Sequence, residues 1–277
     1  MSANNGHLAA TFQFDYTSGA WLQIDGNAGA WWTLPGLLYG DGFFDTMAVW
    51  GGAIQFWPFH QLKVLETALV LGIMVPDQAL ESLPACVNGQ EGVLRVYVVA
   101  QEAGLPHLWV ATFTEQVLER ETKSVSVEFA SGRLDAEALA HQYKLLSRFS
   151  YRQAQREAGG GEALLLNKAG RVASFTSGCV VYGMAAGVYC IPAAEGRQNS
   201  ATLQILQARY GIMGRPLEAN LPGVDWMLAV NSLRLRVVER VGQKHLARPD
   251  GAVLGTFLHH WPWQQILLGG GLPLNAI

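Results

Sequence analysis

The feature that most constrains the fold is a run of strongly β-forming residues from Phe43 to Trp50. Gly40-Asp41-Gly42 precedes the run, Gly51-Gly52 follows it, and Ile54 to Trp57 is a second β-forming segment. Two glycines between two such segments are typical of a tight hairpin turn. The sequence therefore predicts an antiparallel sheet in the first part of the chain.

Further strands are predicted from alternating or β-branched residues bounded by turn residues. They cover Thr11–Tyr16, Ala20–Ile24, Trp31–Leu34, Val93–Val99 and Leu108–Thr114. Between them, Pro58 suits the first turn of a helix that continues to Gly72. Leu62, Leu65 and Leu69 recur at helical spacing and predict its apolar face.

A polar, charge-rich stretch from Glu115 to Ser124 predicts a junction between two domains. We therefore expect an N-terminal domain over 1–118, a linker over 119–131 and a C-terminal domain over 132–277. In the second domain a helix is expected from Ala136 to Ala158, interrupted near 141–144, and another is expected to be capped by Asn199 or Ser200. Strands are predicted over Ala163–Leu166, from Val172 onward, over Val188–Ile191 and over Trp226–Val230.

Composition excludes several classes of protein. With 50 % hydrophobic and 15 % charged residues in 277, the chain is expected to be compact and ordered. A net charge of -3 without a long basic run argues against nucleic-acid binding. No apolar run approaches the ~20 residues needed to cross a bilayer, and residues 1–7 lack the pattern of a signal peptide.

Metal and thiol chemistry are not expected either. Cys86, Cys179 and Cys190 have neither metal-ligand spacing nor the even number of a disulfide framework, which favours a cytoplasmic location. The histidines are scattered apart from His259-His260, and adjacent residues point to different faces of a strand or helix. No metal site is predicted.

The lysines are more informative, because there are only five. Lys144 stands between Tyr143 and Leu145-Leu146, and apolar surroundings lower the pKa of an amine by desolvation. An amine in such a setting can act as a nucleophile toward a carbonyl group. Taken alone, the same pattern also fits a lysine that packs its stem beside a helix core.

Several segments, in order along most of the chain, resemble the fold type IV pyridoxal-phosphate enzymes. The matching segments are Tyr39–Thr46, His60–Lys63, Leu71–Ile73, Gly92–Val96, Lys144–Phe149, Gly161–Asn167, Gly170–Val172 and Asp225–Leu233. Tyr39–Thr46, for example, is similar to the Gly-Asp-Gly-x-Phe-Glu-Thr strand of that family.

The resemblance implies an α/β (α+β) protein with the two-domain, D-amino acid aminotransferase-like fold and pyridoxal 5'-phosphate between the domains of a homodimer. Lys144 would hold the cofactor and move a proton at the substrate α-carbon. The phosphate would rest at Asn199-Ser200, at a helix start, and at the Asn231-Ser232 turn. Arg95 and Arg148 would bind the substrate. The position of Arg148, four residues after Lys144, is similar to that of an arginine in the 4-amino-4-deoxychorismate lyase branch.

The sequence also departs from the family pattern. Ser174 stands where the family has a glutamate facing the pyridine nitrogen, and Lys63 stands where it has a phosphate-binding arginine. Residues Gln198–Ala201 replace Gly-Ile-Thr-Arg, Cys179 replaces an asparagine, and Asp45 replaces a glutamate. A serine cannot hold a proton on the ring nitrogen as a carboxylate does, which should disfavour transamination.

The expected function is a pyridoxal-phosphate-dependent lyase resembling 4-amino-4-deoxychorismate lyase, which releases 4-aminobenzoate and pyruvate from a small amino acid-like substrate. One alternative is a class IV aminotransferase acting on branched-chain or D-amino acids. Another, of a different class, is a non-catalytic protein of the same fold with impaired cofactor binding.

Overall fold

The computed structural model describes residues 7–24, 34–115, 118–119 and 121–264, which form two compact units. Unit 1 contains the described residues up to Leu118 together with the short segment Tyr143–Ser147. Unit 2 contains the described residues from Glu119 to Gln142 and from Arg148 onward. The chain thus leaves unit 2 once to contribute five residues to unit 1.

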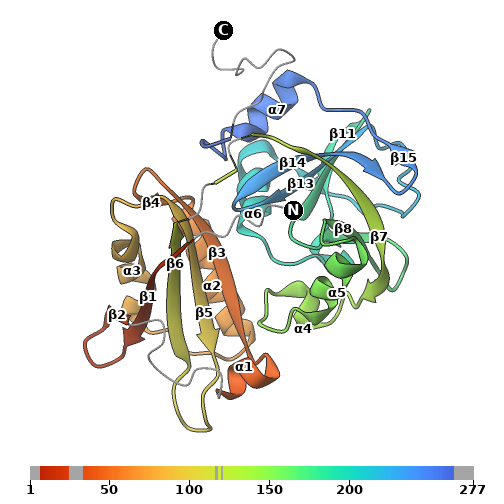
Figure 1. Ribbon diagram of the computed structural model, residues 1–277. Helices are drawn as coiled ribbons and strands as arrows, with labels where there is room; N and C mark the ends of the chain where they lie inside the picture. The colour runs from red at the N-terminus through yellow and green to blue at the C-terminus, as the bar shows by residue number, and fades with distance from the viewer. Residues whose placement is uncertain (1–6, 25–33, 116–117, 120, 265–277) are drawn as a thin grey trace. The chain divides into compact units, whose positions relative to one another are not determined.

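Unit 1 is built on a six-stranded sheet in the described residues, with strand order β2-β1-β6-β5-β3-β4 and antiparallel pairing throughout (Figure 1). Its strands are β1 His7–Asp15, β2 Ala20–Ile24, β3 Gly42–Trp50, β4 Ala53–Ile54, β5 Gly92–Val99 and β6 Leu108–Glu115. Its helices are α1 Pro35–Tyr39, α2 Trp57–Val70, α3 Asp77–Ser82 and the 3-10 turn Leu83–Val87. Trp50 pairs with Ala53 across Gly51-Gly52, so the predicted hairpin is confirmed, although its second strand ends at Ile54.

The core of unit 1 lies between the sheet and α2 and α3. Met47 and Phe113 from the sheet pack there with Val64 and Ala68 of α2, and all four are almost fully buried. Pro58 lies in the first turn of α2, as its fixed φ predicts. The predicted strand over Trp31–Leu34 lies outside the described residues except for Leu34, which is not in a strand.

The predicted apolar face of α2 is wrong. Leu62, Leu65 and Leu69 are 48, 41 and 81 % exposed, whereas His60 and Lys63 on the inner face are 2 and 6 % exposed. The reason is a polar group on the sheet beneath the helix. Asp45 of β3 lies 2.7 Å from Nδ1 of His60 and 2.5 Å from Nζ of Lys63.

These three side chains form a buried polar cluster in an otherwise apolar core. Burial alone would raise the pKa of Asp45, but the positive charge of Lys63, the hydrogen bond from His60 and the more distant charge of Lys144 outweigh it. The pKa of Asp45 is consequently held well below its usual range, so this carboxylate stays ionised. Each member of the cluster needs the others, because a buried charge without a partner is strongly destabilising.

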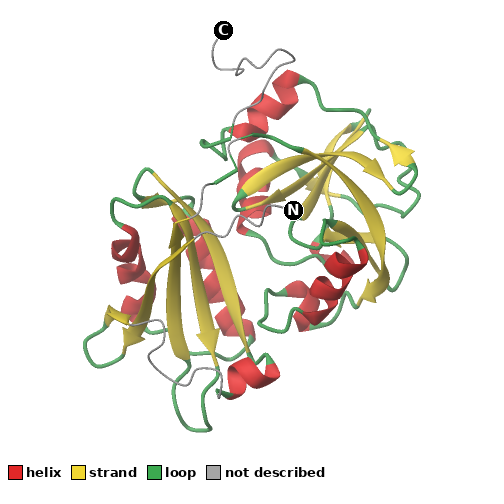
Figure 2. Cartoon of the chain, in the orientation of Figure 1, coloured by secondary structure: helices red, strands yellow, loops and turns green. Residues whose placement is uncertain are grey.

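Unit 2 contains a nine-stranded sheet in the described residues, with main order β12-β11-β10-β13-β14-β7-β8-β9 and β15 beside β14. Figure 2 draws the strands in yellow and the helices in red. The strands are β7 Ser124–Leu134, β8 Ala163–Asn167, β9 Val172–Phe175, β10 Cys179–Met184, β11 Gly187–Cys190, β12 Met213–Gly214, β13 Trp226–Asn231, β14 Arg234–Val241 and β15 Lys244–His245. The helices are α4 Leu139–Gln142, α5 Phe149–Glu157, α6 Ala201–Tyr210 and α7 Gly251–Leu258, with a 3-10 turn at Ala193–Glu195.

The structure corrects the predicted linker over 119–131. Most of it belongs to β7, which pairs in parallel with β14 on one side and with β8 on the other. The strand was hard to recognise because its buried residues are widely spaced: Val127, Ala130 and Leu134 point inward among polar neighbours. The predicted interruption of the 136–158 helix is confirmed, since α4 ends at Gln142 and α5 begins at Phe149.

We expect Asp45→Asn to lower the free energy of unfolding by about 3–5 kcal/mol, because it leaves the Lys63 ammonium buried without its counter-charge. Urea unfolding measures the change. Asp135→Asn is the matched control, since Asp135 pairs with Lys168 at the surface, where an ion pair contributes about 1 kcal/mol or less. Equal losses for the two variants would contradict a dependence of unit 1 on the buried cluster.

Candidate functional site

The segment that carries Lys144 is paired with β3 as an extra piece of strand. The Phe44 amide donates to the Lys144 carbonyl and the Leu146 amide donates to the Gly42 carbonyl, both at 3.0 Å. Leu145 lies opposite Phe43 in an antiparallel bridge. Because β4 pairs only with the far end of β3, this half of the strand has its edge open for Lys144 and its neighbours.

Gly40 and Gly42 explain how the segment can approach so closely. Gly40 has φ +71°, and a Cβ there would lie 2.8 Å from Cβ of Ser147. Gly42 has φ +143°, and a Cβ there would lie 3.0 Å from Cδ1 of Leu146 and would also meet the Val98 carbonyl oxygen of β5. Both positions therefore require glycine, by conformation and by space. The Gly-Asp-Gly motif is thus the place where the Lys144 segment packs closely against the chain, as well as the start of β3.

The Lys144 side chain lies on a polar and aromatic face of the unit 1 sheet. Its Nζ donates to Oγ1 of Thr46 at 3.2 Å and stands 4.6 Å from the centroid of the Phe44 ring. The Phe44 ring stacks on that of Tyr97 at 5.9 Å, and Arg95 lies directly opposite Thr46 in the β3–β5 register. Two predicted site residues, Lys144 and Arg95, therefore share one face of the sheet.

Lys63 is not brought to that face. Successive side chains of a strand point to opposite sides of its sheet, so Asp45 faces α2 while Thr46 faces Lys144. Lys63 is bound to Asp45 on the α2 side, where its side chain is 8 % exposed. The structure therefore gives Lys63 a carboxylate partner in the core and separates it from Lys144 by the sheet.

The remaining predicted residues belong to unit 2, and Ser174 is committed to its own backbone turn. Its hydroxyl oxygen lies 2.9 Å from the carbonyl oxygens of both Phe175 and Gly178, and the residue is 3 % exposed. The single hydroxyl hydrogen is directed to these carbonyls. Ser174 therefore offers lone pairs but no negative charge to a neighbouring group.

The start of α6 lies beside the turn that follows β13. Ser200 is the N-cap of α6, and its Oγ accepts from the Leu203 amide at 3.4 Å. Oγ1 of Thr202 lies 3.5 Å from Oγ of Ser232. Hydroxyls from two elements therefore meet at a helix N-terminus, where free amides and the helix dipole favour an anion. Asn199 has a supporting place, since its Oδ1 accepts from Gln204.

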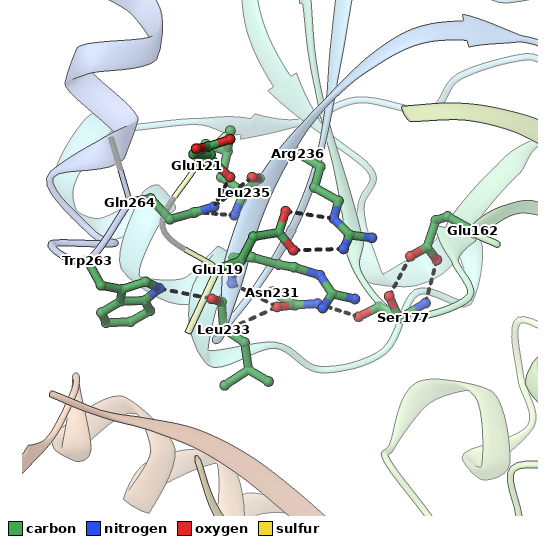
Figure 3. A network of polar contacts seen from close by, with 11 residues as sticks. Glu119, Glu121, Glu162, Ser177, Asn231, Leu233, Leu235, Arg236, Trp263 and Gln264 are labelled. Carbon is green, nitrogen blue, oxygen red and sulfur yellow. Dashed lines mark hydrogen bonds and ion pairs between the residues drawn. The ribbon is translucent and has the colours of Figure 1, made fainter. Parts of the chain in front are cut away.

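Asn231 holds the turn from inside. Its Oδ1 accepts from the backbone amides of Leu233 and Arg234, and its Nδ2 donates to the Ser177 carbonyl at 3.0 Å. The carboxylate of Glu162 in turn accepts from the amide and the hydroxyl of Ser177 (Figure 3). The turns near residues 177 and 232 therefore form one polar network.

Arg148 is a partly buried cation with one donor atom that has no partner. Its guanidinium lies 3.6 Å from the centroid of the Tyr151 ring, and its Nη2 donates to the Thr176 carbonyl at 3.4 Å. Its Nη1 is buried and has no partner. Burial lowers the pKa of Arg148, opposed by its contact with Tyr151. A guanidinium with an unused N–H group is suited to a carboxylate ligand.

Sequence reasoning missed three residues of these surroundings. Thr202 could have been found from its place two residues after the Ser200 cap. Glu162 and Arg234 had no local signal, because their partners are remote in the sequence. The pKa of Arg234 is lowered by burial and by Arg236, which is itself paired with Glu119 at 2.8 Å.

The described residues fit a phosphorylated aldehyde cofactor in part. Within unit 1, Lys144 offers an amine beside an aromatic ring. Within unit 2, the α6 start and Ser232 offer hydroxyls and amides suited to a phosphate. Ser174 supplies no charge for a ring nitrogen, and Lys63 is held by Asp45. No cluster of metal-ligating side chains is found in the described ranges, and no helix there is long and apolar enough to cross a membrane.

A scan against protein-family models gives no match, and a search of curated proteins also gives none. Solved structures do match. A branched-chain aminotransferase from Thermoproteus uzoniensis superposes with a TM-score of 0.76 at 18 % identity, over 92 % of this chain and 97 % of that one. A fold IV transaminase from Curtobacterium pusillum gives 0.74 at 19 % identity, over 92 and 97 %.

Lyases match equally well. A structure described as a putative 4-amino-4-deoxychorismate lyase from Legionella pneumophila gives a TM-score of 0.75 at 16 % identity, over 86 % of this chain and 96 % of that one. The chain therefore has the fold of the fold type IV aminotransferases and lyases, as the resemblance predicted. At these identities the likeness establishes the fold and leaves the activity to the residues.

We expect Gly40→Ala to release the Lys144 segment from β3, because the new Cβ meets Ser147 and the left-handed backbone is strained by about 1–3 kcal/mol. Gly72→Ala is the control, since Gly72 has a similar φ of +67° but open space around it. Hydrogen exchange at the Phe44 and Leu146 amides should accelerate only in Gly40→Ala. Equal exchange in the two variants would show that Gly40 does not seat the segment.

Proposed function

We propose that this chain is a pyridoxal-phosphate-dependent lyase resembling 4-amino-4-deoxychorismate lyase. The observation that carries the proposal is the placement of Lys144. Its backbone is seated on β3 by Gly40 and Gly42, and its amine lies against Thr46 and the Phe44 ring. A surface lysine packed for its stem alone needs neither the glycine seat nor the strand pairing.

Each residue has a defined task in this proposal. Lys144 would hold the cofactor through its amine, and the same amine would move a proton at the substrate α-carbon. The hydroxyls of Ser200, Thr202 and Ser232 bind the phosphate together with the free amides of α6. Pyridoxal phosphate, once joined to an amine, withdraws electrons from the bonds at the α-carbon.

The two arginines recognise the substrate in this scheme. Arg148 has a buried donor without a partner, so a substrate carboxylate would satisfy it with a charge-assisted hydrogen bond. Arg95 lies opposite Thr46, on the face that carries Lys144. The substrate class is therefore a small amino acid with a carboxylate, as in the amino acid-processing enzymes that share the fold.

Ser174 favours the lyase over the aminotransferase. A neutral hydroxyl that donates to two carbonyl groups cannot keep a ring nitrogen protonated. Losing a charge-assisted hydrogen bond there costs about 1.5–3 kcal/mol of stabilisation. A class IV aminotransferase for branched-chain or D-amino acids is the second candidate, supported by the shared fold.

A non-catalytic protein of this fold is the candidate from a different class. It is favoured by two observations, the pairing of Lys63 with Asp45 and the closed hydrogen bonding of Ser174. Homodimer formation and a cytoplasmic location stay predictions from the resemblance and the cysteine usage.

Purified protein mixed with pyridoxal phosphate is expected to develop the absorbance of a lysine-bound cofactor. Borohydride treatment should then leave a pyridoxyl group on the Lys144 peptide, detected by mass spectrometry. Lys144→Ala should abolish both signals. Lys168→Ala is the control, because Lys168 is an exposed lysine paired with Asp135 and should leave both unchanged. A wild-type protein that takes up no cofactor would establish the non-catalytic reading instead.

Product analysis separates the two enzymes. With 4-amino-4-deoxychorismate, we expect pyruvate and 4-aminobenzoate to form. Amino transfer from branched-chain or D-amino acids to a keto acid should be at least tenfold slower. A tenfold difference in rate corresponds to one lost charge-assisted hydrogen bond, about 1.5 kcal/mol or more. Arg148→Lys should raise KM more than it lowers kcat, because lysine keeps the positive charge but lacks the paired N–H groups with which a guanidinium binds a carboxylate. Faster amino transfer than pyruvate release would make the aminotransferase the better assignment.

A further inference from the structure

The segment that follows α7 is bound to the turn between β13 and β14 by its side chains. The indole N–H of Trp261 donates to the Asn231 carbonyl at 2.9 Å, and that of Trp263 donates to the Leu233 carbonyl at 3.1 Å. Both indoles are 1 % exposed. Two partly buried carbonyl groups of the turn therefore accept from donors of one distant segment.

Gln264 extends the same pattern by one more position. Its Oε1 accepts from the Leu235 amide at 2.7 Å, and its Nε2 donates to the Leu235 carbonyl at 3.2 Å (Figure 3). The carboxamide thus takes the place that the backbone of a neighbouring strand would occupy. Backbone groups at 231, 233 and 235, each two residues apart, are all satisfied by residues 261–264.

The other side of this turn faces the start of α6. Asn231 holds it through Ser177, Leu233 and Arg234, and Ser232 lies against Thr202. The turn is therefore held by the Asn231 side chain, which we call the inner contact, and by Trp261, Trp263 and Gln264, which we call the outer contacts. Without the outer contacts, the position of the Ser232 hydroxyl would rest on the inner ones alone.

We infer that Trp261–Gln264 is a positioning segment, which fixes the Asn231–Leu233 turn so that the Ser232 hydroxyl and the α6 N-terminus bind one phosphate together. This inference rests on the proposed function for the identity of the phosphate. The residues of the segment do not touch the cofactor in this scheme. They act through the backbone of the turn, so their removal weakens phosphate binding without touching the Lys144 amine.

The test compares Trp261→Phe/Trp263→Phe with Trp226→Phe. The double variant keeps aromatic packing but removes both N–H donors. Trp226 lies at the opposite end of β13, where its indole packs over Gly183, and provides a matched loss of an indole. Gln264→Leu, which removes the carboxamide and keeps an apolar side chain, is the second variant and carries the test if the double variant does not fold.

Dissociation constants are measured for pyridoxal phosphate and for pyridoxal, which lacks the phosphate. We expect the affinity of the double variant for pyridoxal phosphate to fall about tenfold, the scale of one or two hydrogen bonds. Its affinity for pyridoxal should stay within about twofold of wild type, because a change of that size is smaller than the loss of a typical hydrogen bond. Trp226→Phe should change the affinity for neither ligand. A role in general stability alone would weaken both ligands equally or neither, and either result overturns the inference.

Hydrogen exchange at the Leu233 and Arg234 amides gives a readout that needs no cofactor. It should accelerate in the double variant and in Gln264→Leu, but not in Trp226→Phe. If wild-type protein binds no pyridoxal phosphate, the proposed function fails, and exchange then decides the positioning role by itself. Unchanged exchange in both variants would show that the segment does not fix the turn.

Discussion

The arrangement of the site depends on the alternation of side chains along β3. Asp45 points toward α2 and is neutralised there by Lys63 and His60, while Thr46 points to the other face and contacts Lys144. A shift of one residue would exchange the two faces. The buried charge of Asp45 opposes such a shift, because both side chains that contact its carboxylate, His60 and Lys63, lie on the α2 side. A structural ion cluster therefore sets the register that presents the candidate catalytic amine.

Much of the fold could be predicted from the sequence because the signals were local. Gly51-Gly52 marked the hairpin, Pro58 the start of α2, and Ser200 the cap of α6, and each follows from backbone preferences of a few residues. The exposed face of α2 and the strand β7 could not be predicted in that way. The inner face of α2 includes His60 and Lys63 because Asp45, which lies in another element, binds both. Strand β7 buries too few residues at regular spacing to be recognised.

The candidate site shows the same division between local and remote causes. Lys144 and Ser200 were identified from their neighbours in the sequence. The commitment of Lys63 to Asp45 could not be seen, since a lysine on a helix near leucines gives no sign of a carboxylate on the strand below. Glu162 and Trp261 hold turns that lie 15 and 30 residues away in the chain. Contacts of this kind appear only when the sheet is assembled.

The electrostatics of the residues bear on which reaction the fold can support. A reaction in which negative charge departs with a leaving group asks less of a ring nitrogen than one in which the charge must be held while a proton is moved. Ser174 provides no charge to hold it, whereas the α6 N-terminus, Ser232 and Arg148 all provide donors for anions. The described residues thus offer several donors for anions and no carboxylate at Ser174. In the lyase that we propose, this balance would favour elimination over amino transfer.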